Sequence, residues 1–99
     1  MSYNIITKNL KNEVDEIPIS TNTLFHEYWL PLFEKHKCKN LLNWKYPHDL
    51  EANEIQEIIK EWKRLIPFIQ KTWEKERANF ILKKLKEINY DDYQYISFG

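Results

Sequence analysis

The chain has 99 residues and no net charge, because fifteen basic residues balance fifteen acidic ones. Its length corresponds to one domain spanning residues 1–99, and a composition that is 42% hydrophobic and 15% aromatic is too apolar for a disordered chain. Both halves are balanced, with six charges of each sign in residues 1–49 and nine of each in residues 50–99. Nucleic-acid-binding domains usually carry a basic excess, so binding to DNA or RNA is the less expected function.

Glycine and cysteine are scarce. The only glycine is Gly99, so the glycine-rich loops that hold nucleotide phosphates are absent. Cys38 is the only cysteine, so no internal disulfide can form and a reducing compartment is expected. We recognise no signal peptide and no apolar run of the roughly 18–20 residues that a membrane-spanning helix needs. We therefore expect a cytoplasmic protein without a membrane partner.

Two short strands are predicted within the first twenty residues. Residues 3–7, YNIIT, are rich in β-branched and aromatic side chains, which favour strands. Residues 17–20, IPIS, are expected to be extended, because Pro18 lacks an amide proton and disfavours helix at Ile17. Since proline in a sheet is mostly confined to edges, this segment could form an edge strand that pairs back on residues 3–7.

An aromatic helix is predicted after these strands. Thr21, Asn22 and Thr23 are residue types that cap helices, and apolar residues follow at helical spacing. Pro31 lies inside this segment, so we expect a kink or a break into two short helices. The apolar stretch 41–46 is interpreted as a loop, either a lid over the core or an exposed contact patch.

Two further helices and a final strand complete the predicted elements. Asp49 is expected to cap a helix over residues 50–66, in which glutamates precede lysines and an arginine as the helix dipole favours. A third helix is expected over residues 70–88, and the period-two tail 93–98 predicts a terminal strand. Six residues of the third helix are expected to face inward: Trp73, Ala78, Ile81, Leu82, Leu85 and Ile88.

These elements indicate a mainly α fold with a small β component, of the α+β class. We expect a bundle of three to four helices beside a small sheet. Because the final strand needs a partner and the other strand candidates lie near the amino terminus, the two chain ends are expected to meet in that sheet.

No group of residues has the spacing of a catalytic or metal site. His36 and Cys38 form a His-x-Cys pair, with His48 ten residues later, which lacks the paired four-ligand spacing of structural zinc. Cys38 is expected to be a small buried residue at the carboxyl end of a helix, where the dipole disfavours a thiolate. Four glutamates are expected on the solvent side of their helix: Glu51, Glu54, Glu57 and Glu61. We therefore expect no enzyme, no metal and no cofactor.

Two basic stretches occur, at residues 34–40 and 83–86. Five cations of the third predicted helix could line a phosphate-binding face: Lys75, Arg77, Lys83, Lys84 and Lys86. Interleaved core positions and nearby glutamates favour an ordinary solvated surface instead. A nucleic-acid-binding or regulatory helical domain is therefore the second hypothesis for the function.

Two acidic clusters lie outside the predicted helices. The first comprises Glu13, Asp15 and Glu16, and the second comprises Asp91 and Asp92, flanked by Tyr90, Tyr93 and Tyr95. Tyrosine is common at interfaces because it offers a large rigid face and a polar tip. Carboxylates beside tyrosines suit docking on a basic protein surface, including the phosphate-binding cleft of a nuclease. The alternative is that one or two of these tyrosines pack the sheet against the helices. The predicted partner-binding residues are Asp91, Asp92, Tyr90 and Tyr93, with Glu13, Asp15 and Glu16 as a second patch.

The general plan resembles small bacterial immunity proteins, which neutralise a polymorphic or contact-delivered toxin in the cytosol. The likeness lies in an extended segment that enters an aromatic helix (IPISTNTLFHEYWLPLF), a long helix led by glutamates (DLEANEIQEIIKEWKRLI) and a terminal strand ending YISFG. It is one of organisation, so no functional residue is carried over. The resemblance implies a stoichiometric inhibitor that binds a toxin domain. A phage-encoded inhibitor of a host defence system would have the same organisation.

Overall fold

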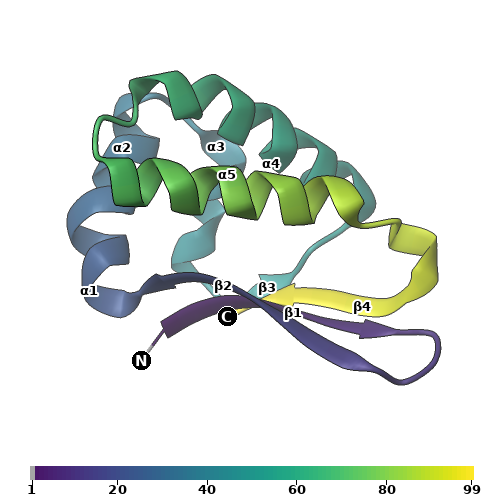
Figure 1. Cartoon of the computed structure of the whole chain (residues 1–99). Helices are drawn as coiled ribbons and strands as arrows, with labels where there is room; N and C mark the ends of the chain where they lie inside the picture. Colours follow the sequence, from purple (N-terminus) through teal and green to yellow (C-terminus); the bar gives the residue numbers. More distant parts are fainter. Residues whose placement is uncertain (1) are drawn as a thin grey trace.

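The computed structural model describes residues 2–99 and shows an α+β fold in which all helices lie on one face of a four-stranded antiparallel sheet (Figure 1). The strand order is β2-β1-β4-β3. The strands are β1 (Ser2–Asn9), β2 (Val14–Thr21), β3 (His48–Asp49) and β4 (Tyr93–Phe98). The α-helices are α1 (Asn22–Leu24), α2 (Leu30–Lys35), α3 (Lys39–Leu42), α4 (Ala52–Leu65) and α5 (Thr72–Glu87).

The sheet brings the two ends of the chain together, as predicted. β1 pairs with β2 through a hairpin, and on its other side it pairs with β4, with Thr7 opposite Ile96. At the hairpin turn, the Asn9 side chain accepts hydrogen bonds from the backbone N–H groups of Lys11 and Glu13. Asn12 adopts a left-handed conformation with φ 67°, which asparagine tolerates better than most residues. The turn residues therefore fix the strand register at this end.

Alternation along the strands separates a buried face from an open one. Side chains of successive strand residues point to opposite faces, and the inward set is buried beneath the helices: Ile5, Thr7, Ile17, Ile19, Ile96 and Phe98. On the opposite face Lys8 of β1 lies between Val14 of β2 and Tyr95 of β4. No described helix covers this second face (Figure 1).

The first long helical segment widens around its proline instead of breaking. A π-helical turn, Phe25–Trp29, joins α1 to α2, and the Leu30 N–H donates to the Phe25 carbonyl five residues earlier. Pro31 follows in the first turn of α2. Proline has no N–H and its ring clashes with the carbonyl four residues before it, and a π turn is one way for a helix to accommodate this. The predicted kink is thus a local widening.

The stretch predicted as an apolar loop is helical. α3 is followed by a 3-10 turn, Asn43–Lys45, and Leu41 and Trp44 are fully buried, so the segment covers the core. Tyr46 is exposed. The helix forms because its first N–H groups meet a buried acceptor from α4, the carboxylate of Glu61. That pairing depends on the tertiary fold, which explains why a local sequence pattern does not reveal it.

Helix α4 is shorter at its start than predicted. Asp49 belongs to β3, where it pairs with Ser97, and the Leu50 N–H donates to the Ile96 carbonyl at 2.7 Å. The chain therefore stays extended through Leu50, and α4 begins at Ala52 with Glu51 in the capping position. The expectation that Asp49 caps the helix was wrong, because the backbone of Asp49 pairs with β4 in the sheet.

The core is built around stacked aromatic rings. Trp62 of α4 lies edge-on to Trp29 at 5.4 Å and to Phe33 at 5.7 Å, and Trp44 stacks on Phe98 at 4.6 Å between ring centroids. Within residues 2–99 the buried indole N–H groups of Trp29, Trp44 and Trp62 meet no hydrogen-bond acceptor. These side chains therefore stabilise the fold through packing and removal of apolar surface from water.

Helix α5 covers the edge of the sheet near β2, with Ala78, Ile81, Leu82 and Leu85 buried. Trp73 was expected to face inward but is 82% exposed. The position one turn before Ala78 on the inward face is the half-buried Glu74, so Trp73 is rotated by about 100° from the inward face. No helix in the described part of the chain is long and apolar enough to cross a membrane.

Candidate protein-binding surface

The structure brings part of each predicted acidic cluster to one end of the sheet. The Leu10 N–H in the hairpin donates to the Asp92 carbonyl at 3.0 Å. The side-chain amide of Gln94 donates to the Asn9 carbonyl and to Oδ1 of Asn12, at 3.0 and 2.8 Å. These bonds hold the hairpin turn against Asp92 and the start of β4. We call the surface formed by Leu10, Glu13, Asp91 and Asp92 the acidic end.

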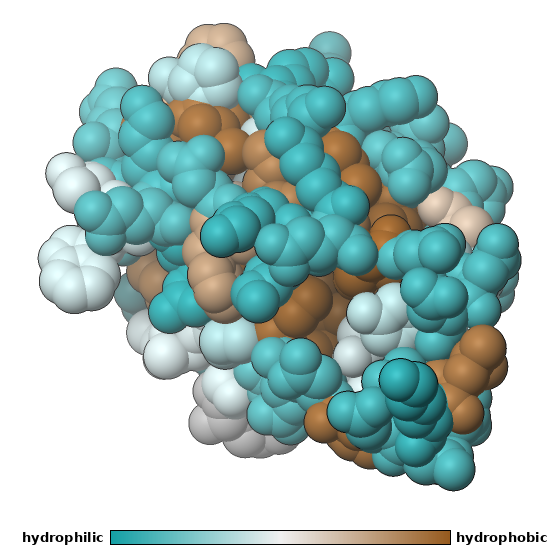
Figure 2. All heavy atoms as spheres, turned by 45° about the vertical axis from the view of Figure 1, so that its right-hand side comes forward, coloured by the Kyte–Doolittle hydropathy of each residue, from teal (hydrophilic) through white to brown (hydrophobic). Residues whose placement is uncertain are grey.

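The acidic end is hollowed and partly hydrophobic. A shallow depression of about 470 Å³ is lined by Asn9, Leu10, Lys11, Glu13, Asp92 and Tyr93. Leu10 is 64% exposed, and Figure 2 shows hydrophobic side chains at the end of the molecule that carries the hairpin, surrounded by polar ones. An exposed leucine beside carboxylates offers a partner both apolar contact and charge. Of the described residues that line the depression, only Lys11 is a cation.

The three tyrosines near Asp91 and Asp92 have different environments. Tyr93 is half-buried and packs against the core, as the alternative interpretation of these tyrosines had it. Tyr90 is 36% exposed, and its hydroxyl donates to a Glu51 carboxylate oxygen at 3.4 Å. Partial desolvation raises the pKa of Tyr90, and the nearby Glu51 carboxylate raises it further. Tyr95 is exposed on the open face of the sheet. Tyr90 is thus the tyrosine available beside the acidic end.

Asp15 and Glu16 lie outside the acidic end, farther along β2. Adjacent strand residues point to opposite faces, so Glu16 lies on the open face, opposite Ile6, while Asp15 lies on the helix side, opposite Thr7. Asp15 Oδ1 accepts the Glu16 N–H at 2.9 Å. Glu13, Asp15 and Glu16 are neighbours in the sequence, but they do not form one patch because β2 places Asp15 and Glu16 on opposite faces of the sheet.

The free edge of β2 is protected against pairing with another strand. Pro18 has no N–H to donate, and its carbonyl accepts a hydrogen bond from Arg77 of α5 at 3.3 Å. The bond from Glu16 to the Asp15 side chain occupies another backbone donor. Such devices make strand addition unfavourable. A partner of this molecule would therefore be recognised through side chains.

A second exposed feature, missed by the sequence interpretation, runs along α5. Among the large hydrophobic residues within 2–99, Trp73 is the most exposed, and Phe80 is 37% exposed. The guanidinium of Arg77 and the ammonium of Lys84 lie 5.5 and 5.8 Å from the Phe80 ring centroid. The signal in the sequence is the spacing of these four residues, which places them on one helical face. We call this set, Trp73, Arg77, Phe80 and Lys84, the α5 stripe.

Cys38 has the environment of a structural thiol. It is fully buried, and burial raises its pKa, opposed by Arg64 and reinforced by Glu61. It precedes α3 instead of ending a helix as expected. His36 stacks on Phe68 at 4.4 Å between ring centroids. Within residues 2–99 no three His, Cys, Asp or Glu side chains are grouped to hold a metal ion.

His48 is held by acceptors on both ring nitrogens. Nδ1 lies 2.8 Å from the Tyr46 carbonyl, and Nε2 lies 2.8 Å from a Glu54 carboxylate oxygen. Only the protonated ring can donate from both nitrogens. Burial lowers the pKa of His48, but the bonds with Glu54 and Tyr46 outweigh burial and raise it above the ordinary value. The imidazolium thus ties the strand β3 to the start of α4.

A raised pKa in the folded state makes His48 a source of pH-dependent stability. The unfolded chain loses this proton near pH 6.5, so the stabilisation is complete below about pH 6.5 and is lost as the pH rises through the folded pKa. As the pH rises through this range, we expect the free energy of unfolding of the wild type to fall relative to that of His48→Gln. Urea denaturation at a series of pH values measures the difference. A difference that stays constant or grows with pH would contradict the assignment.

The chain matches no protein-family model, no curated protein and no solved structure. The resemblance to bacterial immunity proteins therefore stays a prediction, and the functional conclusions rest on the surfaces of this molecule.

Proposed function

We propose that this protein is a stoichiometric inhibitor that binds another protein through its acidic end, as an immunity protein binds a toxin domain. The observation that carries the proposal is the meeting of Glu13 with Asp92 across the bonded contact between the hairpin and the segment before β4. Residues far apart in the sequence thereby form one acidic surface, which also carries the exposed Leu10. The partner is expected to present a basic surface, such as the phosphate-binding cleft of a nuclease.

Two properties of the acidic end favour binding of a protein over binding of a small molecule. The depression at the acidic end is shallow and open, with only Leu10 and Tyr93 as large apolar lining residues, whereas sites for small molecules are mostly enclosed and apolar. The backbone that carries the carboxylates is fixed by the hairpin turn and by the 3-10 turn Tyr90–Asp92, so little backbone entropy is lost when a partner binds.

Charge reversal of Asp91 and Asp92 tests this surface. Both side chains are exposed, so Asp91→Lys with Asp92→Lys is expected to leave the fold intact. Loss of attraction and new repulsion should lower the association rate with a basic partner about tenfold or more, with a smaller effect on dissociation. The partner is first captured from a lysate of the native host on the immobilised wild-type chain. Its association rate with each variant is then measured by stopped flow at several salt concentrations.

A matched control separates local from overall charge. Glu27→Lys with Glu57→Lys changes the net charge equally at exposed sites outside the acidic end, and should lower the rate much less. If a toxin gene lies beside the gene for this protein, co-expression provides the functional readout. Wild-type protein should protect the host cell, and the Asp91→Lys, Asp92→Lys variant should protect less. Equal protection by both would reject the acidic end as the binding surface.

A further inference from the structure

The α5 stripe combines aromatic rings and cations on one exposed helical face. Its residues are spaced four, three and four apart, so they follow one another along the helix. Phe80 is flanked by Arg77 and Lys84, both within 6 Å of its ring centroid. Trp73 begins the stripe and is 82% exposed. Tryptophan and arginine are enriched among the residues that contribute most to protein–protein binding. Because the Trp73 side chain is so exposed, its burial in the core does not explain a tryptophan at this position.

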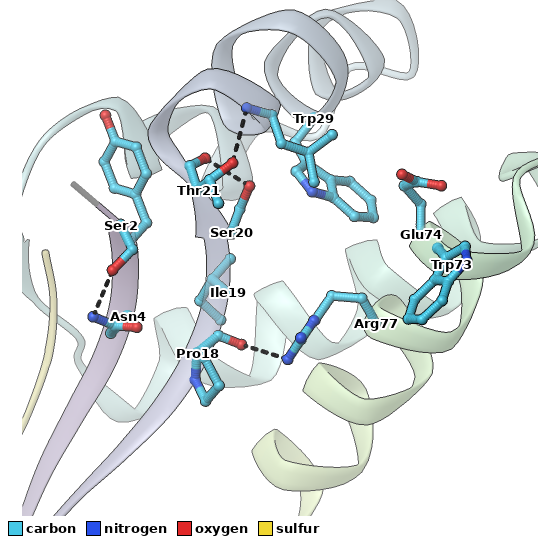
Figure 3. A pocket seen from close by; sticks show the side chains of 12 residues that line it. Ser2, Asn4, Pro18, Ile19, Ser20, Thr21, Trp29, Trp73, Glu74 and Arg77 are labelled. Atoms are coloured by element: carbon cyan, nitrogen blue, oxygen red, sulfur yellow. Dashed lines mark hydrogen bonds between the residues drawn. The ribbon is translucent and has the colours of Figure 1, made fainter.

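A hollow of about 310 Å³ opens beside the stripe, between α5 and the end of β2. Figure 3 shows Trp73, Glu74 and Arg77 on one wall and Pro18, Ile19, Ser20 and Thr21 on the other. The Arg77 side chain crosses from α5 to the Pro18 carbonyl and fixes one margin of the hollow. The apolar side chains of Ile19, Leu24 and Trp73 contribute to the lining. A hollow of this size accommodates one branched or aromatic side chain.

The charges around the stripe favour an acidic partner. Helix α5 carries five basic and three acidic residues, whereas the acidic end carries three carboxylates. Although the chain has no net charge, the acidic end is therefore negative and helix α5 is positive. Carboxylates of a partner would meet Arg77 and Lys84 at the stripe, where each cation lies over the Phe80 ring. Opposite charges on facing surfaces speed association and favour the correct partner.

The same surroundings favour protein over nucleic acid. Glu74 lines the hollow, and Glu76 is exposed beside Arg77 on the same helix. A nucleic-acid backbone presents regularly spaced phosphates, which these carboxylates would repel. A peptide can place its own carboxylates selectively beside the cations and an apolar side chain in the hollow.

We propose that the α5 stripe and the adjacent hollow bind an acidic segment of a partner protein. Carboxylates of that segment pair with Arg77 and Lys84, and one apolar side chain enters the hollow beside Trp73. This inference does not rest on the proposed inhibitory function, since the acidic end and the α5 stripe share no residue. The molecule would then contact partners through two surfaces of opposite charge.

Trp73 provides a direct signal for binding, because the other three tryptophans are buried. The probe is a short synthetic peptide in which glutamates surround a central Phe-Leu pair, and its control carries lysine at each glutamate position. Adding the acidic peptide should shift the tryptophan emission of the intact protein to shorter wavelength. The lysine peptide should produce no shift, and the shift should weaken steeply as salt is raised.

Variants locate the binding site. Trp73→Phe should abolish the emission shift while calorimetry still detects binding, and Lys84→Glu should weaken binding about fivefold, by removing an attraction and adding a repulsion. Lys60→Glu is the matched control, because Lys60 is an exposed lysine on α4. The Asp91→Lys, Asp92→Lys variant should bind the acidic peptide at least as well as the wild type, which separates this test from that of the acidic end. Circular dichroism verifies that each variant is folded.

Three results would overturn the inference. One is the absence of any emission shift with the acidic peptide at low salt. A second is a stronger response to a thymidine oligonucleotide than to the acidic peptide, which would make the stripe a nucleic-acid surface. The third is concentration-dependent association of the protein alone in sedimentation velocity, weakened by Lys84→Glu, which would make a second copy of this chain the occupant.

Discussion

Replacing Glu61 by alanine is expected to destabilise the fold by about 3 kcal/mol or more, since hydrogen bonds to a charged group contribute roughly 1.5–3 kcal/mol each. Glu61 is only 8% exposed. It accepts the backbone N–H groups of Asn40 and Leu41, at 3.1 and 2.9 Å, and the side-chain amide of Asn40 at 2.8 Å. Alanine would leave the N–H groups at the start of α3 without an acceptor inside the protein.

Urea denaturation followed by circular dichroism measures this effect. Glu61→Gln retains an acceptor oxygen but not the charge, so its stability should lie between those of the wild type and the alanine variant. Glu57→Ala is the matched control, because Glu57 is an exposed glutamate on the same helix that pairs with Lys60, and its loss should change stability by less than about 0.5 kcal/mol. Equal effects at Glu61 and Glu57 would show that the buried carboxylate does not hold α3 to α4.

Trp62→Ala is expected to destabilise the fold by about 3–5 kcal/mol, the usual range for removing a large aromatic side chain from a core. Trp62 is fully buried, and its ring lies within 6.1 Å of the Trp29 and Trp44 rings, measured between centroids. Its removal would leave a cavity at the junction of α2, α3 and α4. Because the indole N–H has no acceptor within residues 2–99, the loss should come almost entirely from packing. Trp62→Phe should accordingly be much milder.

The same substitution at the surface provides the comparison. Trp73→Ala removes an equally large side chain that is 82% exposed, so its effect should stay within about 0.5 kcal/mol. Thermal unfolding of the two variants, with tryptophan emission as a second probe, tests both statements. A large loss of stability in Trp73→Ala would mean that Trp73 belongs to the core and that the α5 stripe is not a free surface.

The parts of the fold with a strong local pattern were predicted correctly. The segments around 3–7 and 17–20 form strands, the tail 93–98 forms β4, and the chain ends meet in one sheet. The long helix predicted over 50–66 is observed over Ala52–Leu65. In each case, an apolar repeat with the period of a strand or helix also faces the core, so local preference and tertiary packing favour the same structure.

Two single-residue errors have a common origin in helical phase. Glu61 was assigned to the solvent side, yet it lies three residues after Ile58 and four before Leu65, both buried. Trp73 was assigned to the core, yet it lies five residues before Ala78 and thus off the buried face. In both cases the position on the helix, and not the residue type, determines burial. A buried carboxylate and an exposed tryptophan are rare. Here the carboxylate of Glu61 accepts hydrogen bonds from α3, and Trp73 belongs to the α5 stripe.

The stretch between Lys39 and Leu50 could not be predicted, because distant residues determine its structure. α3 depends on Glu61, and the two-residue strand β3 depends on pairing with Ser97 and Phe98. The acidic end posed the same difficulty. Sequence identified Glu13, Asp91 and Asp92 as charges outside the helices, but only the hairpin register and the bond from Leu10 to Asp92 place them together.

The position of β4 inside the sheet has a consequence for how the protein is made. β1 and β3 both pair with β4, which is the last of the described strands to leave the ribosome. During translation the hairpin of β1 and β2 and the helices can begin to form, but one edge of β1 stays open until residues 93–98 emerge. Nascent chains stalled before that point would expose this edge to other chains and to chaperones, and completion of the sheet would follow synthesis of β4.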